Sequence, residues 1–285
     1  MDTSKQQKAI LARHPELKGS VFTAVDVGWD SLAIDAHDRL IFKFPKHEAA
    51  EARLRREVRF LEIIRPIVSM PVPDLRLHEG LPVFSSHAKL KGTYLLADDY
   101  AKLSDASRQD AAEKLALFYA ELHSISPALM ADAGAQPLPP WRGIGDILEK
   151  ALPHIAAEHH DWARETLAAW VGLPADPYGT VFGFYDGHGW NMAFDHQRGK
   201  LNGVYDFADS GFGPLHQDFI YSSFIDEDLT LRIIACYERI TGKRIDRRRV
   251  DILTAAYRLH ELAGIAHDPP QIPHARANVE AWARR

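Results

Sequence analysis

A strand-rich segment of about ninety residues precedes a longer helix-rich segment, and this order constrains the fold more than any other feature of the chain. Short β-rich runs bounded by turn residues predict the strands, and apolar residues at spacings of three and four predict one helix among them. The predicted strands are 21–27, 32–34, 40–44, 75–77 and 81–85, and the predicted helix is 49–67.

From Gly92 onward the periodicity is mainly that of helices, with Ser104 as an expected N-cap. A helix kinked at Pro153 is predicted over 147–171, a strand over 181–185, a hairpin from 192–194 and 201–205, and helices from 216 on with breaks near 242 and at 269–270. The sequence therefore predicts an α+β fold of two lobes, residues 1–91 and 92–285.

Composition excludes several classes of protein. The chain has 285 residues, with 34 Lys and Arg against 39 Asp and Glu, so its net charge of −5 disfavours a strongly basic nucleic-acid binder. The single cysteine, Cys236, excludes an intrachain disulfide. The sequence holds no apolar run of ~18 residues and no secretory signal, so we expect no membrane partner and a cytoplasmic location.

The densest polar cluster is 185–191, in which Asp186 precedes Asn191 by five residues. This is the Asp-to-Asn spacing of the kinase catalytic loop, where a carboxylate accepts the proton of a hydroxyl and an amide oxygen holds a metal ion. Gly187 and Gly189 would allow the backbone to turn sharply between Asp186 and Asn191. The spacing alone is a weak signal, and it gains weight only with the elements that follow.

Asp206 follows an apolar strand, fifteen positions after Asn191, where a carboxylate could bind Mg²⁺. A buried acid paired with a loop amide is the alternative. Lys43 lies between aromatic residues of a strand, and a buried ammonium group needs a partner, for which Glu57 is the candidate; the alternative is a lysine on the solvent face. Such a pair can hold the phosphates of a nucleotide.

No G-x-G-x-x-G is present in the first turn, and no P-loop is present anywhere, so a P-loop enzyme is excluded. Gly28 and Ser31 could still offer backbone N–H groups to phosphates. An unrelated α/β hydrolase is disfavoured because the chain lacks G-x-S-x-G.

Taken in order, these elements resemble the aminoglycoside phosphotransferase family, the small-molecule branch of the protein-kinase-like fold. Residues 184–195, FYDGHGWNMAFD, are similar to the family's H-G-D-L-H-x-x-N loop with the apolar residues and Asp that follow it. Residues 118–125 resemble its L-x-x-L-H helix end, 41–45 resemble its V-F-R-F-P strand, and Asp218 matches a second family acid, whose counterpart supports the fold near the catalytic loop. Phe184 and Gly187 depart from the motif, since the family has a His and an apolar residue there.

The resemblance implies a kinase that moves the γ-phosphate of ATP or GTP to a hydroxyl of a small molecule, such as an aminoglycoside, an amino alcohol or a sugar. Asp186 would be the base, Asn191 and Asp206 the Mg²⁺ ligands, and Lys43 with Glu57 the phosphate clamp. The segment 86–92, with His87 and Lys89, would meet the nucleotide base. A monomer or weak homodimer is expected, and the alternative is a catalytically silent kinase-like protein that binds a nucleotide or another ligand.

The acceptor is expected to be cationic, since the acidic run Asp226, Glu227 and Asp228 lies in the helical lobe. The alternative is that these acids cap the helix that begins near Leu229. His188 would contact the acceptor or orient Asp186.

Overall fold

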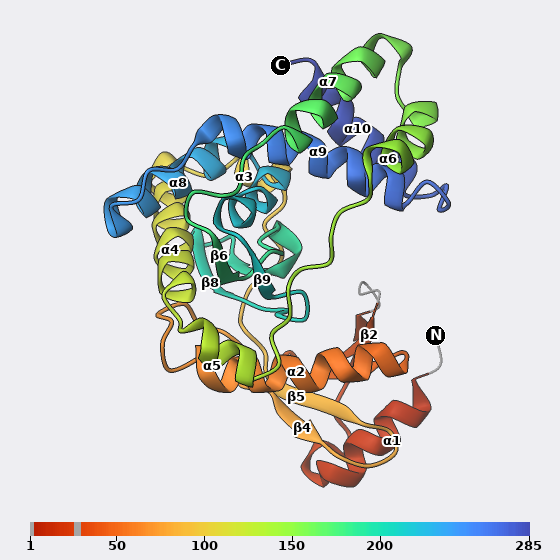
Figure 1. Ribbon diagram of the computed structural model, residues 1–285. Coiled ribbons are helices and arrows are strands. Elements are labelled where there is room, and N and C mark those ends of the chain that lie inside the picture. The colour runs from red at the N-terminus through yellow and green to blue at the C-terminus, as the bar shows by residue number, and fades with distance from the viewer. Residues whose placement is uncertain (1–2, 26–29) are drawn as a thin grey trace.

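The computed structural model describes residues 3–25 and 30–285, arranged as a sheet-containing part and a larger helical part (Figure 1). The first part is a five-stranded antiparallel sheet in the order β1-β2-β3-β5-β4 with the helices α1 and α2. The bounds are α1 Ser4–Arg13, β1 Phe22–Val25, β2 Ser31–Ala36, β3 Leu40–Pro45, α2 Glu48–Ile64, β4 Arg76–His78 and β5 Phe84–Ala88. The predicted α+β fold is confirmed, and α1 was not predicted.

The two faces of this sheet have different neighbours, because side chains alternate along each strand. Ile34, Phe42, Phe44 and Phe84 are buried together on one face with Ile10 of α1. Residues of β3 between the phenylalanines project to the other face, where α2 lies. The alternation therefore directs Lys43 toward α2 and away from the apolar cluster.

The second part holds the remaining helices and two small two-stranded sheets, β6–β9 and β7–β8. The helices are α3 Ala97–Tyr100, α4 Asp105–His123, α5 Pro127–Asp132, α6 Ile144–Ala151, α7 His160–Val171, α8 Glu227–Thr241, α9 Arg247–Gly264 and α10 Ile272–Ala283. The strands are β6 Thr180–Gly183, β7 Met192–Asp195, β8 Lys200–Val204 and β9 Gly211–Pro214. Short 3-10 turns span Pro15–Leu17, Leu152–His154, Ala157–His159, Gly189–Asn191, Leu215–Phe219 and Tyr221–Phe224.

Two hydrophobic clusters hold the helical part. The main one joins α4 and α8 to β6, β7 and β8. A second cluster lies among α6, α7, α9 and α10, where Ile147, Leu167, Leu259 and Val279 are all fully buried. These four helices gather at one end of the helical part (Figure 1).

Several local predictions are confirmed and two are wrong. The hairpin β7–β8 forms, and the Ser104 hydroxyl accepts the Ser107 N–H at 3.2 Å as the cap of α4. The single helix over 147–171, kinked at Pro153, is wrong: α6 ends before Pro153, which has no N–H to donate, and the separate helix α7 begins at His160. Residues 215–224 form 3-10 turns rather than an α-helix. In the described part of the chain, no helix has the length and apolar character to span a bilayer.

The chain crosses from the sheet to the helices at Gly92, whose φ is +135°. A Cβ there would lie 2.6 Å from the backbone of Phe194, so no other residue fits without movement. Thr93 then exchanges two backbone hydrogen bonds with Phe194, at 3.0 and 2.8 Å. The crossing segment is thereby fastened to β7, the strand that follows the predicted catalytic loop.

Candidate active site

The loop between β6 and β7 carries Asp186, and the side chain of Asp218 fixes the backbone conformation of this loop. This fully buried carboxylate accepts the backbone N–H groups of Phe184 at 3.0 Å and Tyr185 at 2.5 Å. Tyr185 has φ +53°, a conformation that a non-glycine residue adopts only when its surroundings hold it there. His123, at the end of α4, contacts Asp218 at 2.9 Å and completes the support.

The Asp186 carboxylate is oriented by its two neighbours in the loop. The Asn191 side-chain amide donates to Asp186 Oδ2 at 2.6 Å and to the Asp186 carbonyl at 3.0 Å. His188 Nε2 lies 3.0 Å from Asp186 Oδ1. Burial acts to lower the pKa of His188, but the hydrogen bond and negative charge of Asp186 raise it overall. His188 therefore contacts Asp186, and whether it orients the carboxylate or contacts the acceptor stays a prediction.

Lys43 joins the sheet, α2 and the loop after β8. Its Nζ lies 3.2 Å from Glu57 Oε2 and 3.1 Å from Asp206 Oδ1. Although burial alone would lower the pKa of Lys43, the two carboxylates raise it, so the ammonium form is held. Lys43 in turn lowers the pKa of Asp206 against the effect of burial. Glu57 also accepts the Phe207 N–H at 2.9 Å, which fixes the residue after Asp206.

The two predicted metal ligands offer oxygen atoms, the donors that Mg²⁺ prefers. Asp206 has φ +69° and a side chain that is 40% exposed, so it remains open to a ligand. Asn191 uses its amide nitrogen for Asp186, which leaves its amide oxygen for a cation. No cluster of three or more His, Cys, Asp or Glu suited to a metal occurs among residues 3–25 and 30–285, so a metal there would depend on these two groups, phosphates and water.

Phe184 stands where the resembled motif has a histidine, and aromatic packing holds its side chain in place. Phe184 is 1% exposed, with its ring centroid 4.9 Å from Phe207 and 5.7 Å from Phe118 of α4. The aromatic cluster underlies both the Asp186 loop and the Asp206 turn. Apolar packing therefore couples the two loops.

The remaining predicted nucleotide residues are spread along the sheet. His87 pairs with Ile41 across the strands and shares the face of Lys43; burial lowers the pKa of His87 to about 4, so it is neutral near pH 7. Lys89 is engaged elsewhere, with its Nζ 2.6 Å from both Asp35 and Asp38. Ser31 begins β2. Gly28 lies outside the described residues.

The acidic run at the start of α8 has partners within the helical part. Asp226 accepts the Asp228 N–H at 2.8 Å as the N-cap, and Asp228 accepts Tyr100 Oη at 2.7 Å and Arg232 Nε at 2.9 Å. Glu227 forms an ion pair with Arg285. Asp226 therefore caps the helix, as the capping alternative expected, whereas Glu227 and Asp228 pair with side chains.

Two acids near Asp186 were missed by sequence reasoning. Asp209 lies in the turn after Asp206 and is accessible, yet desolvation and the charges of Asp186 and Asp206 raise its pKa to about 6. Burial raises the pKa of Glu261, on α9, with Arg258 and His188 opposing the rise. The one sequence feature that could have indicated either acid was the position of Asp209, three residues after Asp206.

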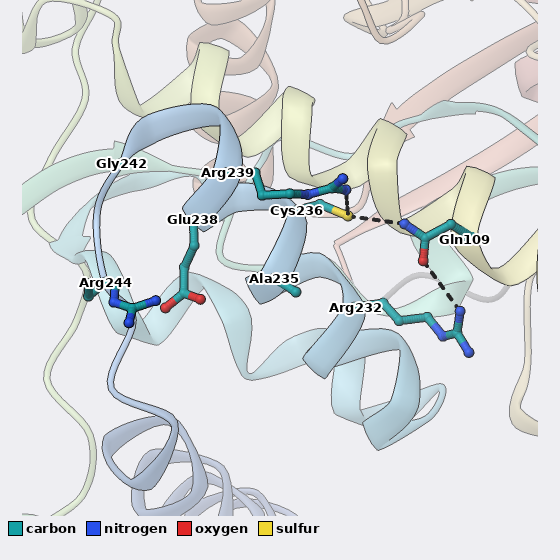
Figure 2. A pocket seen from close by; sticks show the side chains of 8 residues that line it. All are labelled: Gln109, Arg232, Ala235, Cys236, Glu238, Arg239, Gly242 and Arg244. Carbon is teal, nitrogen blue, oxygen red and sulfur yellow. Dashed lines mark hydrogen bonds between the residues drawn. The ribbon is translucent and has the colours of Figure 1, made fainter.

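A surface hollow of about 610 Å³ lies between α4 and α8, away from these carboxylates. Figure 2 shows Arg239 turned toward Cys236, at 3.0 Å from the sulfur, and Arg232 reaching the Gln109 amide oxygen at 3.3 Å. Arg232 and Arg239 are thus engaged by neighbouring side chains. None of the lining residues belongs to the predicted nucleotide or metal site.

Comparisons with solved structures identify the fold. The GDP complex of wild-type aminoglycoside 2'-phosphotransferase-IIIa superposes with a TM-score of 0.85 at 18% identity, covering 100% of this chain and 99% of that one. Macrolide 2'-phosphotransferase type I gives 0.71 at 17% identity, with coverage of 97% and 96%. The macrolide 2'-phosphotransferase MphH from Brachybacterium faecium gives 0.67 at 16%, with coverage of 96% and 98%. A search of curated proteins finds no match.

At the sequence level, a family model described as the phosphotransferase enzyme family matches residues 21–253. The match includes β1 to β5, the Asp186 loop, the Asp206 turn and the first turns of α9. It extends over more than three quarters of the chain. The chain therefore belongs to the phosphotransferase enzyme family.

Proposed function

We propose that the protein transfers the γ-phosphate of ATP or GTP to a hydroxyl group of a small cationic molecule, with Asp186 as the base. The observation that carries this proposal is the position of Asp186, whose carboxylate is held by Asn191 and His188 beside the Lys43–Asp206 ion pair. A hydroxyl that loses its proton during phosphoryl transfer needs such an oriented carboxylate.

The donor phosphates are assigned to Lys43, Asn191 and Asp206. Lys43 is held as a cation by Glu57 and Asp206, so it can hold phosphate oxygens without losing its charge. Bound Mg²⁺ would neutralise negative charge on the phosphates, held by the amide oxygen of Asn191 and the carboxylate of Asp206. We assign residues 1–91 to the nucleotide-binding lobe and residues 92–285 to the lobe that supplies the base and binds the acceptor, with the boundary at Gly92.

The acceptor is assigned to Asp209 and to Tyr257 and Glu261 of α9. Asp209 is accessible and negatively charged above pH 6, and Glu261 has one carboxylate oxygen without a hydrogen-bond partner among the described residues. Tyr257, also on α9, lies near enough to both acids for their charges to act on it. A cation here would gain charge-assisted hydrogen bonds. This assignment replaces the acidic run 226–228, whose carboxylates are used in capping and ion pairs.

The test is a panel of cationic, neutral and anionic polyols, with release of ADP or GDP as the signal and Asp186→Asn as the inactive control. The proposal expects turnover with at least one cationic acceptor and turnover at least about 10²-fold lower with the control. A thermal-shift measurement with nucleotide, with and without Mg²⁺, shows whether the protein binds nucleotide, and the acceptor panel shows whether it transfers phosphate. Stabilisation by nucleotide with no transfer to any acceptor would favour the catalytically silent alternative.

A further inference from the structure

The absence of a side chain at Gly187, the residue after the base, has a steric cause. Gly187 is not in a left-handed conformation, so its backbone does not require glycine. A Cβ at this position would lie 2.1 Å from Tyr119 Oη, but 3.4 Å from the Tyr119 ring carbon that carries it and 3.8 Å from Phe184. The single obstacle at short range is therefore one hydroxyl group.

Packing fixes the position of the Tyr119 hydroxyl, and its burial there lowers the stability of the protein. Tyr119 is fully buried on α4, and its Oη has no hydrogen-bond partner among the described residues. The ring stacks on His123 at 6.1 Å and 7°, and meets Phe219 edge-on at 5.8 Å. His123 is the residue that contacts Asp218, so the ring belongs to the layer that holds the Asp186 loop. Burying an unpaired hydroxyl costs stability, and removing it should recover that cost.

We infer that Tyr119 is a positioning residue for Asp186: its hydroxyl fills the space beneath Gly187 and restricts the backbone of the Asp186–His188 segment. This inference rests on the proposed function, because it assigns the effect to the base. A glycine next to the base has wide conformational freedom, and a displacement of about 1 Å at a reacting group can lower the rate by ~10²-fold. The hydroxyl therefore limits that freedom at the expense of stability.

The inference predicts effects of opposite sign in one variant. Tyr119→Phe should raise the Tm by about 2–4 °C, because the unpaired hydroxyl is gone. The same change should lower kcat by about tenfold with little effect on either KM, because the loop loses its support. A residue with a purely structural role would move Tm without lowering kcat.

Gly187→Ala alone should lower both Tm and kcat, since its methyl group meets the Tyr119 hydroxyl. Combined with Tyr119→Phe, the methyl group lies 3.4 Å from the ring, an ordinary contact, and fills the space left by the hydroxyl. The double variant should therefore recover most of the wild-type kcat. Gly145→Ala is the matched control, because a Cβ there meets nothing within 4 Å.

The experiment measures kcat, both KM values and Tm for the four proteins of this cycle and the control. Full kcat in Tyr119→Phe would overturn the positioning role, and a double variant no better than Gly187→Ala would overturn the steric pairing. Absence of transfer by the wild-type protein would count against the proposed function instead. In that case the Tm cycle and hydrogen exchange of the 187–191 amides, which Tyr119→Phe should accelerate, still decide whether the hydroxyl restricts the loop.

Discussion

Replacing Lys43 with methionine should separate the stability of the ion-pair cluster from its role in catalysis. The change leaves Glu57, which is 2% exposed, without its cation, and removes the cation from Asp206. Breaking one side of a buried pair costs about 3–5 kcal/mol, and the low end applies here because Asp206 is 40% exposed and screened by water. We expect a loss of ~3 kcal/mol, which corresponds to a Tm lower by about 6–12 °C.

A second substitution tests whether the loss comes from the stranded carboxylate. In Lys43→Met/Glu57→Gln the glutamine is neutral, and its oxygen can still accept the Phe207 N–H. The double variant should recover about 2 kcal/mol of the lost stability, while nucleotide affinity stays weakened in both variants. Lys102→Met, at a site 75% exposed, is the control and should stay within ~0.5 kcal/mol of wild type.

Urea unfolding without nucleotide gives the free energies, and calorimetry with Mg²⁺ and nucleotide gives the affinities. Because the pKa of Lys43 is raised, the difference in unfolding free energy between wild type and Lys43→Met should persist on the alkaline side of neutral pH. Burial raises the pKa of Glu57 and Lys43 opposes the rise, so in the variant Glu57 takes up a proton more readily and the difference should decline toward acid. It should shrink above about pH 10.4, where an unfolded lysine deprotonates, and again in acid as Asp206 protonates. The reasoning is refuted if the unfolding free energy of Lys43→Met lies within about 1 kcal/mol of that of the wild type, or if the double variant recovers no stability.

The other predictions concern the carboxylates. Asp186→Asn should lower kcat by about 10²–10⁴-fold while the calorimetric nucleotide Kd stays within about twofold; more than a tenth of the wild-type turnover would contradict the assignment. Asp206→Asn should raise the Mg²⁺ concentration for half-maximal activity, and an unchanged Mg²⁺ titration would count against its role. Since Asp209 has a pKa raised to about 6, kcat/KM for a cationic acceptor should fall as the pH drops through 6; Asp209→Asn should remove that step, and a step that persists would exclude Asp209.

Local sequence patterns predicted the fold class and the side chains that lie together at the centre of the candidate site. Alternation along residues 40–44 places Lys43 opposite the buried phenylalanines, and helical periodicity after it places Glu57 within reach; the structure contains that ion pair. The five-residue spacing from Asp186 to Asn191 likewise corresponds to a direct hydrogen bond. These features depend on contacts within one or two neighbouring elements, which periodicity can describe.

Features that depend on distant segments were not available from the pattern. Glu261 reaches the neighbourhood of His188 through the packing of α9, more than seventy residues further along the chain. The raised pKa of Asp209 follows from desolvation and from the nearby charges of Asp186, Asp206 and Asp30, which no sequence spacing predicts. For the acidic run at 226–228, capping and ligand binding have the same sequence signature, and only the positions of Tyr100, Arg232 and Arg285 distinguish them.

The separate hydrophobic cluster of α6, α7, α9 and α10 has a consequence for divergence within the family. Its buried residues pack mainly on one another, so substitutions there can accumulate without disturbing the packing beneath Asp186 and Asp206. Glu261 lies on α9, one of these four helices, whereas Tyr257 of the same helix packs against the main cluster. Under the proposed function, a change at Glu261 can therefore alter acceptor preference from a part of the molecule that diverges semi-independently, while Tyr257 and the proposed phosphoryl-transfer residues remain under a stricter constraint.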